Sequence, residues 1–408
     1  MKICLLTDMP PCRNFTAGIV LDILCNFLLE AGHEVCCLSV VDKAIDPVIP
    51  EDKRTRMKFE SIRKPRENWG ILGRIRGIRS LVSFIGNNAV ALFKLPGIAK
   101  KAANFAKCNH ADIIWNVVQG QTMIKITRPT AKIAGLPYVI HIWDHPTWWL
   151  HDMGFDRFTT RFVLNEFHQA VQHSQCCITA SEAMAEDYKQ RYNAPKALPV
   201  ILGFNPGHIM PSGKKNNGDF VIALSGQMYA SDELMALIGA ISQLRWQYAD
   251  KDIVLRLYGR YFNLGKFSTP VNIEWRGWLS QDELLAELAN ADLLYCPYIF
   301  DTTYADVSRL SFPSKLSTYM KTGTPVLFHG PDYSSPLTLL KRYNAAYMCD
   351  TLDIDALSQV ISDIIKDPNR DTVAVRGYEA FEENLTLDIM RKNFFESLGC
   401  PIENIALE

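Results

Sequence analysis

The chain alternates between short apolar runs and longer segments whose apolar positions repeat at helical spacing. Ile3–Thr7 is almost wholly apolar, a helical pattern follows from about Ala17 to Ala31, and His33–Val40 is apolar again. A continuous apolar run is typical of a strand covered on both faces, as in a parallel sheet. The opening therefore predicts a strand–helix–strand unit.

The same alternation continues through the first half of the chain and starts again in the second. Asp112–Val118 and Tyr138–Trp143 are predicted strands, and Phe220–Leu224 and Asp252–Tyr258 are predicted strands of the second half. Between the halves lies GFNPGHIMPSGKKNNGD (203–219), whose Gly, Pro and Asn content is typical of a linker. This pattern predicts two doubly wound, Rossmann-like parallel α/β domains facing a cleft, residues 1–205 and 206–386.

Composition limits the class of protein and its compartment. The 408 residues suit two domains, and a net charge of −1 gives no overall attraction to nucleic acid, so no such partner is expected. Eleven cysteines without a Cys-x-x-Cys spacing indicate a reducing compartment and argue against a zinc site. The chain begins without a signal-peptide pattern, and no apolar run has the roughly 18 residues of a membrane span. We expect a cytoplasmic protein, soluble or peripheral at the membrane.

One segment departs from this neutral balance. Residues 68–107 contain seven Lys or Arg and no Asp or Glu, and Ile75, Ile78, Val82 and Ile85 lie at helical spacing. A basic amphipathic helix can lie on an anionic membrane surface. It can also pack its apolar face on the sheet and leave its arginines in solvent. The sequence leaves both open, so 69–107 is a candidate for peripheral membrane contact.

The strongest candidate for chemistry is RLSFPSKLSTYMKTGTPVLFHG (309–330). It predicts a helix capped by Ser311 with Pro313 in its first turn, an end at Gly323, and a strand at Val326–His329.

The start of this helix offers groups that suit an anion. Ser314 and Lys315 lie beside backbone N–H groups that have no partner within the helix, which favours a phosphate oxygen. Thr318 lies one turn beyond Ser314 and can contact a second polar group of the same ligand. An ordinary capped helix–strand unit is the alternative.

The stretch also resembles a known family. Lys315-Leu316, Tyr319-Met320 and GTPVL (323–327) resemble the donor-nucleotide helix of GT-B glycosyltransferases, in particular the retaining, family-4-like group (glycosyl transferases group 1). That family's E-A-M-A-x-G-x-P-V-V segment holds the ribose through a glutamate, whose position is Thr318 here. The family's earlier glutamate falls at Leu310. The chain therefore matches the motif at other positions but lacks both glutamates.

The resemblance implies further donor contacts. Gly18 and Gly226 resemble glycines that the family places near the donor phosphates, although Gly18 can equally be a packing or turn glycine. The family has a basic residue where this chain has Gln227, and Arg260 is a candidate for the missing cation. The resemblance also implies that a C-terminal helix, within 387–408, packs back on the first domain.

In the first half, HIWDHPTWWLHD (141–152) follows a predicted strand. Residues just past the carboxyl end of such a strand face the ligand crevice, which makes Asp144 and His145 candidate catalytic residues. Trp148 and Trp149 are candidates to stack on a sugar. The family often ends this strand in His-Asp, and Asp144 matches that aspartate. A structural polar loop is the alternative.

Two further kinds of contact concern sugar hydroxyls and a metal ion. Asp301 or Asp306 could contact sugar hydroxyls in place of the missing glutamate, or be solvated loop acids. His141, His145 and His151 lack the spacing of a known metal motif, so no metal and no other cofactor is expected.

The resemblance implies a metal-independent glycosyltransferase that moves a sugar from a nucleotide-sugar donor to a glycan or lipid-linked acceptor, as in polysaccharide biosynthesis. Retention of configuration follows from the family-4 likeness, whereas Asp144 would be a general base if the enzyme inverts. A nucleotide-sugar epimerase of the same fold and a non-catalytic partner subunit are the alternatives, the latter because both glutamates are absent.

Overall fold

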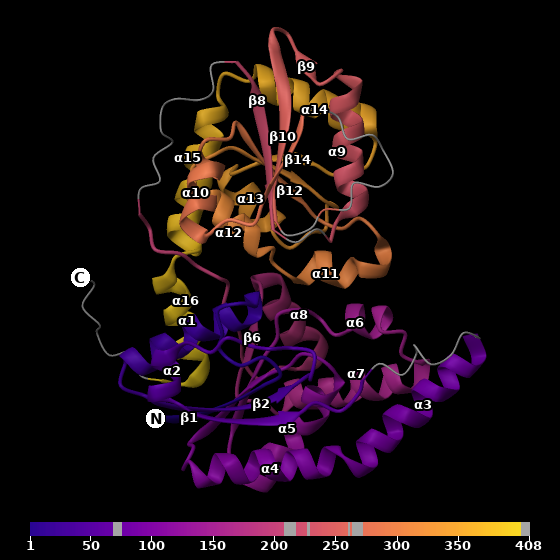
Figure 1. Cartoon of the computed structure of the whole chain (residues 1–408), viewed down its shortest axis with the longest axis vertical. Helices are drawn as coiled ribbons and strands as arrows, with labels where there is room; N and C mark the ends of the chain where they lie inside the picture. Colours follow the sequence, from indigo (N-terminus) through magenta and orange to yellow (C-terminus); the bar gives the residue numbers. More distant parts are fainter. Residues whose placement is uncertain (68–75, 208–217, 227–228, 260–261, 263–271, 401–408) are drawn as a thin grey trace. The chain divides into compact units, whose positions relative to one another are not determined.

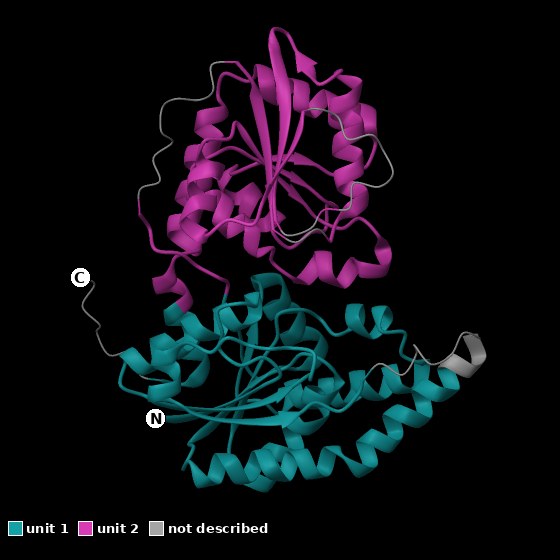
Figure 2. Ribbon diagram, viewed as in Figure 1, with its two compact units in different colours: residues 1–200, 391–408 teal, residues 201–390 magenta. Residues whose placement is uncertain are grey.

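A computed structural model describes residues 1–67, 76–207, 218–226, 229–259, 262 and 272–400, with the side chains of 76–79 left out. The chain divides into two compact units (Figure 2). Unit 1 comprises Met1–Val200 with Arg391–Glu408, and unit 2 comprises Ile201–Met390. Each unit is a parallel sheet with helices in its connections (Figure 1).

The sheet of unit 1 has the doubly wound order. Its first strand pairs in parallel with the second on one side and with the fourth on the other, so the winding direction reverses there. In sheet order the strands are β3 (Lys58–Arg63), β2 (Glu34–Val41), β1 (Lys2–Thr7), β4 (Ile113–Val117), β5 (Tyr138–His141), β6 (Cys177–Thr179) and β7 (Ala197–Pro199). The helices are α1 (Thr16–Glu30), α2 (Glu51–Arg56), α3 (Arg76–Phe93), α4 (Leu95–Cys108), α5 (Gln121–Ala134), α6 (Thr147–Asp152), α7 (Arg157–Gln172) and α8 (Glu182–Tyr192).

Alternate residues of these strands supply different faces of the sheet. Leu6 and Ile114 join a buried cluster with Ala102 of α4 and Ile126 of α5. The neighbouring residue Trp115 packs instead against the C-terminal helix, described below. Because both faces are covered, the inner strands are mostly apolar, whereas the edge strand β3 has exposed polar residues at Lys58, Glu60 and Arg63.

Unit 2 repeats this order. In sheet order its strands are β11 (Ile273–Gly277), β10 (Lys251–Tyr258), β8 (Phe220–Ser225), β12 (Leu293–Pro297), β13 (Val326–His329) and β14 (Tyr347–Cys349), and β9 (Gln247–Tyr248) pairs antiparallel with β10. The helices are α9 (Ser231–Gln243), α10 (Gln281–Ala289), η2 (Thr302–Tyr304), α11 (Ala305–Leu310), α12 (Ser314–Lys321), α13 (Leu337–Tyr343), α14 (Ile354–Lys366), α15 (Arg370–Asn384) and α16 (Leu387–Leu398), whose last residues belong to unit 1.

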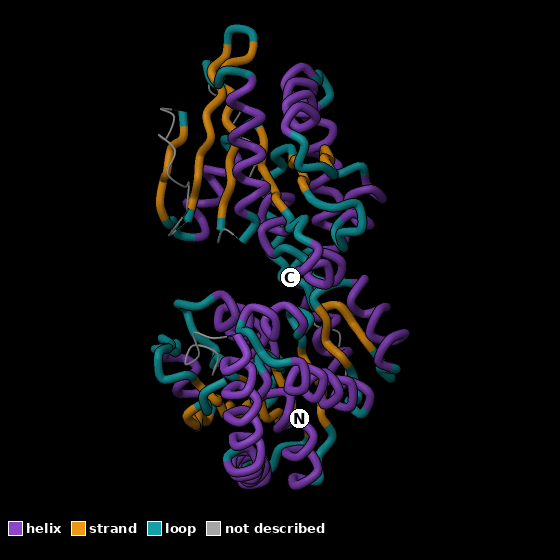
Figure 3. Tube along the Cα trace, turned by 90° about the vertical axis from the view of Figure 1, so that its right-hand side faces the viewer, coloured by secondary structure: helices purple, strands orange, loops and turns teal. Residues whose placement is uncertain are grey.

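Helices cover both faces of the unit 2 sheet (Figure 3). One buried cluster joins Ile222 and Leu255 to Leu237 of α9 and Ile361 of α14. A second cluster, which includes Leu316 and the phenylalanine of α15, covers the other face. The predicted strand Val326–His329 is confirmed, because β13 has the same bounds.

The boundary between the units falls earlier than the predicted one. Gly203 and Phe204 belong to unit 2 because this segment pairs with the start of α16: the Phe204 N–H donates to Leu385 O at 3.1 Å, and the Leu387 N–H donates to Phe204 O at 3.1 Å. A Cβ on Gly203 would lie 2.3 Å from Thr386 O, so only glycine allows the two strands of chain to approach this closely.

Further along, α16 packs in unit 1. Phe394 lies 4.8 Å from Trp115 between ring centroids, the Asn393 amide donates to Pro199 O at 2.9 Å, and Lys196 pairs with Glu396 at 3.0 Å. The chain therefore passes between the units twice, and the two connections are hydrogen-bonded to each other at their unit 2 ends.

The basic segment contains α3 and α4, which join at Lys94, just before the proline in the first turn of α4. Ser80–Cys108 is long and apolar enough to cross a membrane by length and composition, contrary to the prediction that no such run exists. Composition alone does not separate such a span from a core helix, and the alanine-rich face of α4 is part of the unit 1 core. Within Ser80–Cys108, only 28% of the apolar 18-residue stretch that meets this criterion is buried.

The α3 helix buries polar as well as apolar residues, and Val90 near its end belongs to the unit 1 core. Its buried positions include Ser83 and Asn87, and the Asn87 amide donates to Ser83 Oγ at 3.2 Å. Leu81, Phe84 and Ile85 are exposed, Ile85 by 58%. Ile85 therefore does not pack on the sheet, which was one of the two interpretations of this segment.

Candidate functional site

The candidate donor site lies at the carboxyl edge of the unit 2 sheet. Here β8 pairs with β10 on one side and β12 on the other, so the winding direction reverses at β8. In open α/β sheets ligands bind beside the carboxyl ends of the strands at such a reversal. Gly226 directly follows β8, and the start of α12 belongs to the same unit.

Gly226 allows the chain to turn sharply after β8. Its φ of +94° lies in the region that glycine adopts without strain, and its N–H donates to Tyr258 O at 2.9 Å. A Cβ on Gly259 would lie 2.8 Å from Gly226 O, so the ends of β8 and β10 approach each other closely through two glycines. Backbone atoms therefore line the turn at Gly226, where the sequence predicted a donor contact.

The α12 helix begins later than predicted. Ser311 is the C-terminal cap of α11, and Pro313 is the N-terminal residue before α12, with no side-chain cap on the first N–H groups. The prediction that Ser311 caps α12 is wrong because residues 302–310, expected as a loop, form η2 and α11. Gly323 does adopt the left-handed conformation after the helix, with φ +63°.

A buried tyrosine connects α12 to the end of β8. The Ser225 N–H donates to the Tyr319 hydroxyl at 2.7 Å, and the ring is fully buried. This bond ties α12 to the end of β8, directly before Gly226.

Lys315 is the cation of this site. Its side chain is half-buried, with Nζ 4.8 Å from the centroid of the Tyr229 ring and Cε 3.9 Å from where a Cβ on Gly226 would lie. Among the residues described, no carboxylate lies within ion-pair distance of Lys315. Burial lowers its pKa, and the nearby Cys296 opposes that shift only as a thiolate. Burial also raises the pKa of Cys296 to about 12, so the thiol is neutral at ordinary pH.

The other predicted donor residues differ in what the structure shows. Ser314 is exposed at the first position of α12, and Thr318 is 9% exposed on the same helix. Gln227 and Arg260 lie outside the described residues. Asp301 caps η2, accepting the Thr303 N–H at 2.8 Å, so this interaction already engages its carboxylate.

A buried acid near this site was missed. Glu233 in the first turn of α9 is 3% exposed, and its carboxylate accepts the Phe300 N–H at 2.8 Å. Burial raises its pKa, and the Phe300 N–H opposes that shift. Its backbone carbonyl accepts the Tyr295 hydroxyl at 2.8 Å, and that hydroxyl also lies 2.6 Å from His329 Nδ1. The sequence signal was present in Asp232-Glu233, but only the tertiary structure separates the buried acid from its neighbour.

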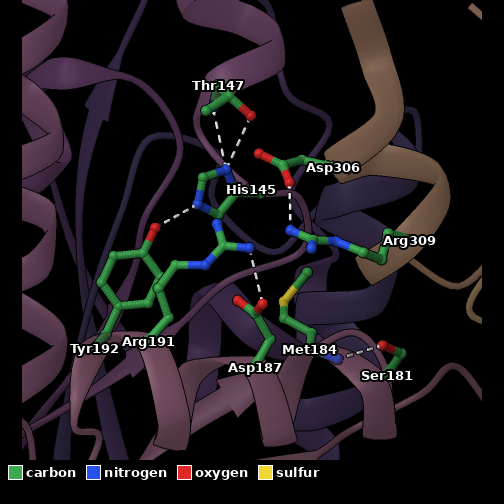
Figure 4. A network of polar contacts seen from close by, with 9 residues as sticks. All are labelled: His145, Thr147, Ser181, Met184, Asp187, Arg191, Tyr192, Asp306 and Arg309. Carbon is green, nitrogen blue, oxygen red and sulfur yellow. Dashed lines mark hydrogen bonds and ion pairs between the residues drawn. The ribbon is translucent and has the colours of Figure 1, made fainter. Parts of the chain in front are cut away.

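The unit 1 candidates surround the end of β5. The strand ends at His141, before the predicted Trp143, and Asp144 lies half-buried in the bend that follows. His145 is buried, with Nδ1 2.9 Å from Thr147 Oγ1 and Nε2 2.7 Å from the Tyr192 hydroxyl (Figure 4). Both ring nitrogens are therefore engaged within unit 1, and a catalytic role for His145 stays a prediction.

Burial corrects the prediction for Trp149. Trp149 is 5% exposed and packs edge-on against Phe155, so it cannot stack on a sugar, whereas its neighbour Trp148 is half-buried. Successive residues of a helix point about 100° apart, which explains why α6 buries only one of the pair fully. A Cβ on Gly18 would lie 2.1 Å from Cys12 Sγ, so Gly18 makes room for its own loop.

Two further carboxylates, one in each unit, are paired with an arginine of the same unit. Asp306 accepts from Arg309 at 2.7 Å, and Asp187 accepts from Arg191 at 2.8 Å (Figure 4). Within the part of the chain that the structure describes, no three His, Cys, Asp or Glu side chains gather as metal ligands would.

No protein-family model matches the sequence, and no curated protein matches it either. Solved structures do match. The chain is similar to sucrose-phosphate synthase from Thermosynechococcus elongatus, with 14% identity, a TM-score of 0.68 and 97% of each chain covered. It is similar to HepE from Anabaena in complex with UDP, with 14% identity, a TM-score of 0.67 and 98% of this chain and 100% of that one covered. It is also similar to a glycosyltransferase from Rickettsia africae, with 12% identity, a TM-score of 0.64, and 97% and 98% covered. The two parallel-sheet α/β units thus have the fold of GT-B glycosyltransferases.

Proposed function

We propose that this chain is a glycosyltransferase that takes its sugar from a nucleotide-sugar donor, with the donor diphosphate at Gly226, Lys315 and the start of α12. The observation that carries the proposal is Lys315, a half-buried cation for which the described residues offer no carboxylate partner. A buried charge is costly unless an opposite charge compensates it. A diphosphate is the anion that such a site would take, because uncapped N–H groups at the helix start add to the attraction.

The charge balance of the reaction supports the same arrangement. When the bond between sugar and diphosphate breaks, negative charge develops on the leaving diphosphate, and fixed positive groups stabilise that charge. Lys315 and the first turn of α12 would supply this stabilisation without a metal ion. Asp144 would orient a hydroxyl of the donor or acceptor, and retention of configuration follows from the family-4 resemblance.

The acceptor is proposed from two observations. The exposed apolar face of α3, with its basic flanks, supports a membrane contact on the cytoplasmic side, and a glycan or lipid-linked sugar is the acceptor that fits such a place. Among the similar structures, HepE is described in complex with UDP-glucose and WaaB as a lipopolysaccharide outer core galactosyltransferase. These two neighbours support a uridine nucleotide as the first donor to test and a lipid-borne glycan as the first acceptor.

Incubation with a panel of nucleotide-sugars tests the proposal. Slow release of free nucleoside diphosphate without acceptor, accelerated by an acceptor, is the expected result for a transferase. An isomerised nucleotide-sugar without release would identify an epimerase. Neither change with any donor, in a folded protein, would overturn the proposal and favour the non-catalytic partner subunit, which the absence of the two glutamates at Leu310 and Thr318 makes the main competitor.

A further inference from the structure

A second concave site lies wholly within unit 1. Residues 62–66, at the end of β3, and the start of α4 enclose a pocket of about 520 Å³. This volume is in the range of small-molecule sites, roughly 300–1,000 Å³. Its lining includes Arg63, Lys64, Arg66, Lys94 and Lys101, and no acidic residue.

Much of this positive charge is uncompensated. Lys64 pairs with Asp8 at 3.1 Å and Glu67 at 3.4 Å, so its charge is balanced. Arg63, Lys94 and Lys101, in contrast, have no carboxylate within ion-pair distance among the residues that the structure describes, and all three are exposed. A cavity with several unpaired cations and no acid suits a phosphate-bearing ligand.

The surface beside the pocket is apolar and faces solvent. Leu92 and Phe93, directly before Lys94, are 71% and 82% exposed. They continue the exposed face of α3, and Phe84 of that face contacts Phe158 of α7, with ring centroids 6.1 Å apart. The buried side of α3 combines the polar residues Ser83 and Asn87 with the core residue Val90, and the Gln121 amide donates to Asn87 Oδ1 at 2.6 Å. The large exposed side chains therefore cannot be buried by turning the helix without exposing Val90 and breaking this hydrogen bond.

We propose that this pocket binds the phosphate headgroup of an anionic membrane lipid, and that the outward face of α3 and Phe158 lies in the interfacial region of the bilayer. Cations beside exposed aromatic and aliphatic side chains match an amphiphile, whose anionic head and apolar tail are joined. A free phosphate would use the cations and leave the apolar face without a role. The proposal rests on the membrane contact of the proposed function and specifies its ligand, but it does not require sugar transfer.

Vesicle flotation with charge-reversal variants tests this pocket. Phosphatidylcholine vesicles with and without phosphatidylglycerol are mixed with the full chain, with Lys94→Glu/Lys101→Glu, and with Lys100→Glu/Lys107→Glu. Lys100 and Lys107 are exposed on the same helix but do not line the pocket, and both double variants change the net charge equally. We expect the parent to bind only the anionic vesicles, less at high salt. The pocket variant should bind about tenfold or more weakly, and the control variant clearly less so.

Two outcomes overturn the proposal. Equal weakening by both double variants would mean a diffuse electrostatic contact, and undiminished binding by the pocket variant would place the contact elsewhere. Calorimetric titration with glycerol 3-phosphate distinguishes a lipid headgroup from a soluble phosphate as the ligand of the pocket. Tight binding of this soluble headgroup without vesicle binding would assign the pocket to a soluble phosphate. Release of nucleoside diphosphate without vesicles, measured on the same variants, keeps a failure of this proposal separate from a failure of the donor site.

Discussion

At the scale of single residues, the donor site proposed for unit 2 depends on Lys315, a cation for which the described residues offer no carboxylate partner. Lys315 lies beside Gly226 and over the Tyr229 ring, and burial disfavours its charged form. The aromatic contact offsets part of that cost, by about 0.5–2 kcal/mol in general. A bound diphosphate would offset more of it, because it supplies a full negative charge.

Lys315→Ala should weaken binding of nucleoside diphosphate by roughly ten- to a hundredfold, since it removes a charge-assisted hydrogen bond worth about 1.5–3 kcal/mol. Thr318→Ala removes a neutral hydroxyl and should cost less, about 0.5–1.5 kcal/mol. Calorimetric titration with the diphosphate and with the bare nucleoside measures both. The nucleoside should bind Lys315→Ala as it binds the parent. Unchanged binding of both ligands would remove the start of α12 from the donor site.

The same lysine predicts how binding depends on pH. Burial lowers the pKa of Lys315 below its usual 10.5, so the free protein loses this charge at a lower pH than an exposed lysine does. Below that pKa the amine is charged and the diphosphate binds fully. As pH rises through it, affinity should fall. Cys296, with a pKa of about 12, stays neutral in this range. Titrations at increasing alkaline pH should show the fall in the parent and none in Lys315→Ala, and a parallel fall in both would assign it to another group.

In unit 1 the residue to test is Asp144. Its position in the bend after β5 predicts that Asp144→Asn leaves the fold intact and lowers turnover at least tenfold, on the order of 1.4 kcal/mol in the barrier. Asp152→Asn, at the end of α6, is a matched control and should turn over normally. Near-normal turnover of a folded Asp144→Asn protein would make Asp144 a structural loop residue.

At the scale of elements, the two chain segments that connect the units are held together by hydrogen bonds. Residues 203–204 and 385–387 are hydrogen-bonded to each other, and Gly203 lies against Thr386 O. These two hydrogen-bonded segments both belong to unit 2. Residues 203–204, at the start of the linker predicted over 203–219, are therefore part of the unit 2 structure.

Gly203→Ala should lower the free energy of unfolding by about 1–3 kcal/mol, because its Cβ would overlap Thr386 O and the backbone must move apart. Gly207→Ala is the control, since a Cβ there meets nothing within 4 Å. It should be neutral or slightly stabilising, as it restricts the unfolded chain. Urea unfolding of both variants measures the difference, and equal stabilities would mean that the connection yields at no cost.

At the scale of the whole molecule, each unit has its own sheet and its own core. A donor that binds only the β8 and α12 region should therefore stabilise unit 2 by mass action, by about 2.7 kcal/mol when its concentration is 100 times the dissociation constant. Hydrogen exchange measured by peptide should show new protection at 220–226 and 314–321 with nucleoside diphosphate, and no change at 34–41. Protection confined to unit 1 would contradict the assignment of the donor to unit 2.

The sequence by itself determined the fold class and the alternation of strands and helices, although the expected loop at 302–310 forms η2 and α11. Continuous apolar runs predict strands buried on both faces, and helical periodicity predicts the helices between them. Both are local properties of the chain, so the alternation within each half was visible in the sequence. Val326–His329 and the left-handed Gly323 followed from the same local rules. Gly226 and Lys315, two predicted donor residues far apart in the chain, lie close together in the structure, and their role in donor binding stays a prediction.

Only the tertiary structure decided which side chains are available for chemistry. Trp148 and Trp149 are identical residues in adjacent positions, yet the packing of α6 buries one and half-exposes the other. The contacts of His145 with Tyr192 and of Gly18 with Cys12 could likewise not be read from the sequence. The periodicity of α3 was clear, but the direction of its apolar face was not, because that direction depends on the partners that the rest of unit 1 provides.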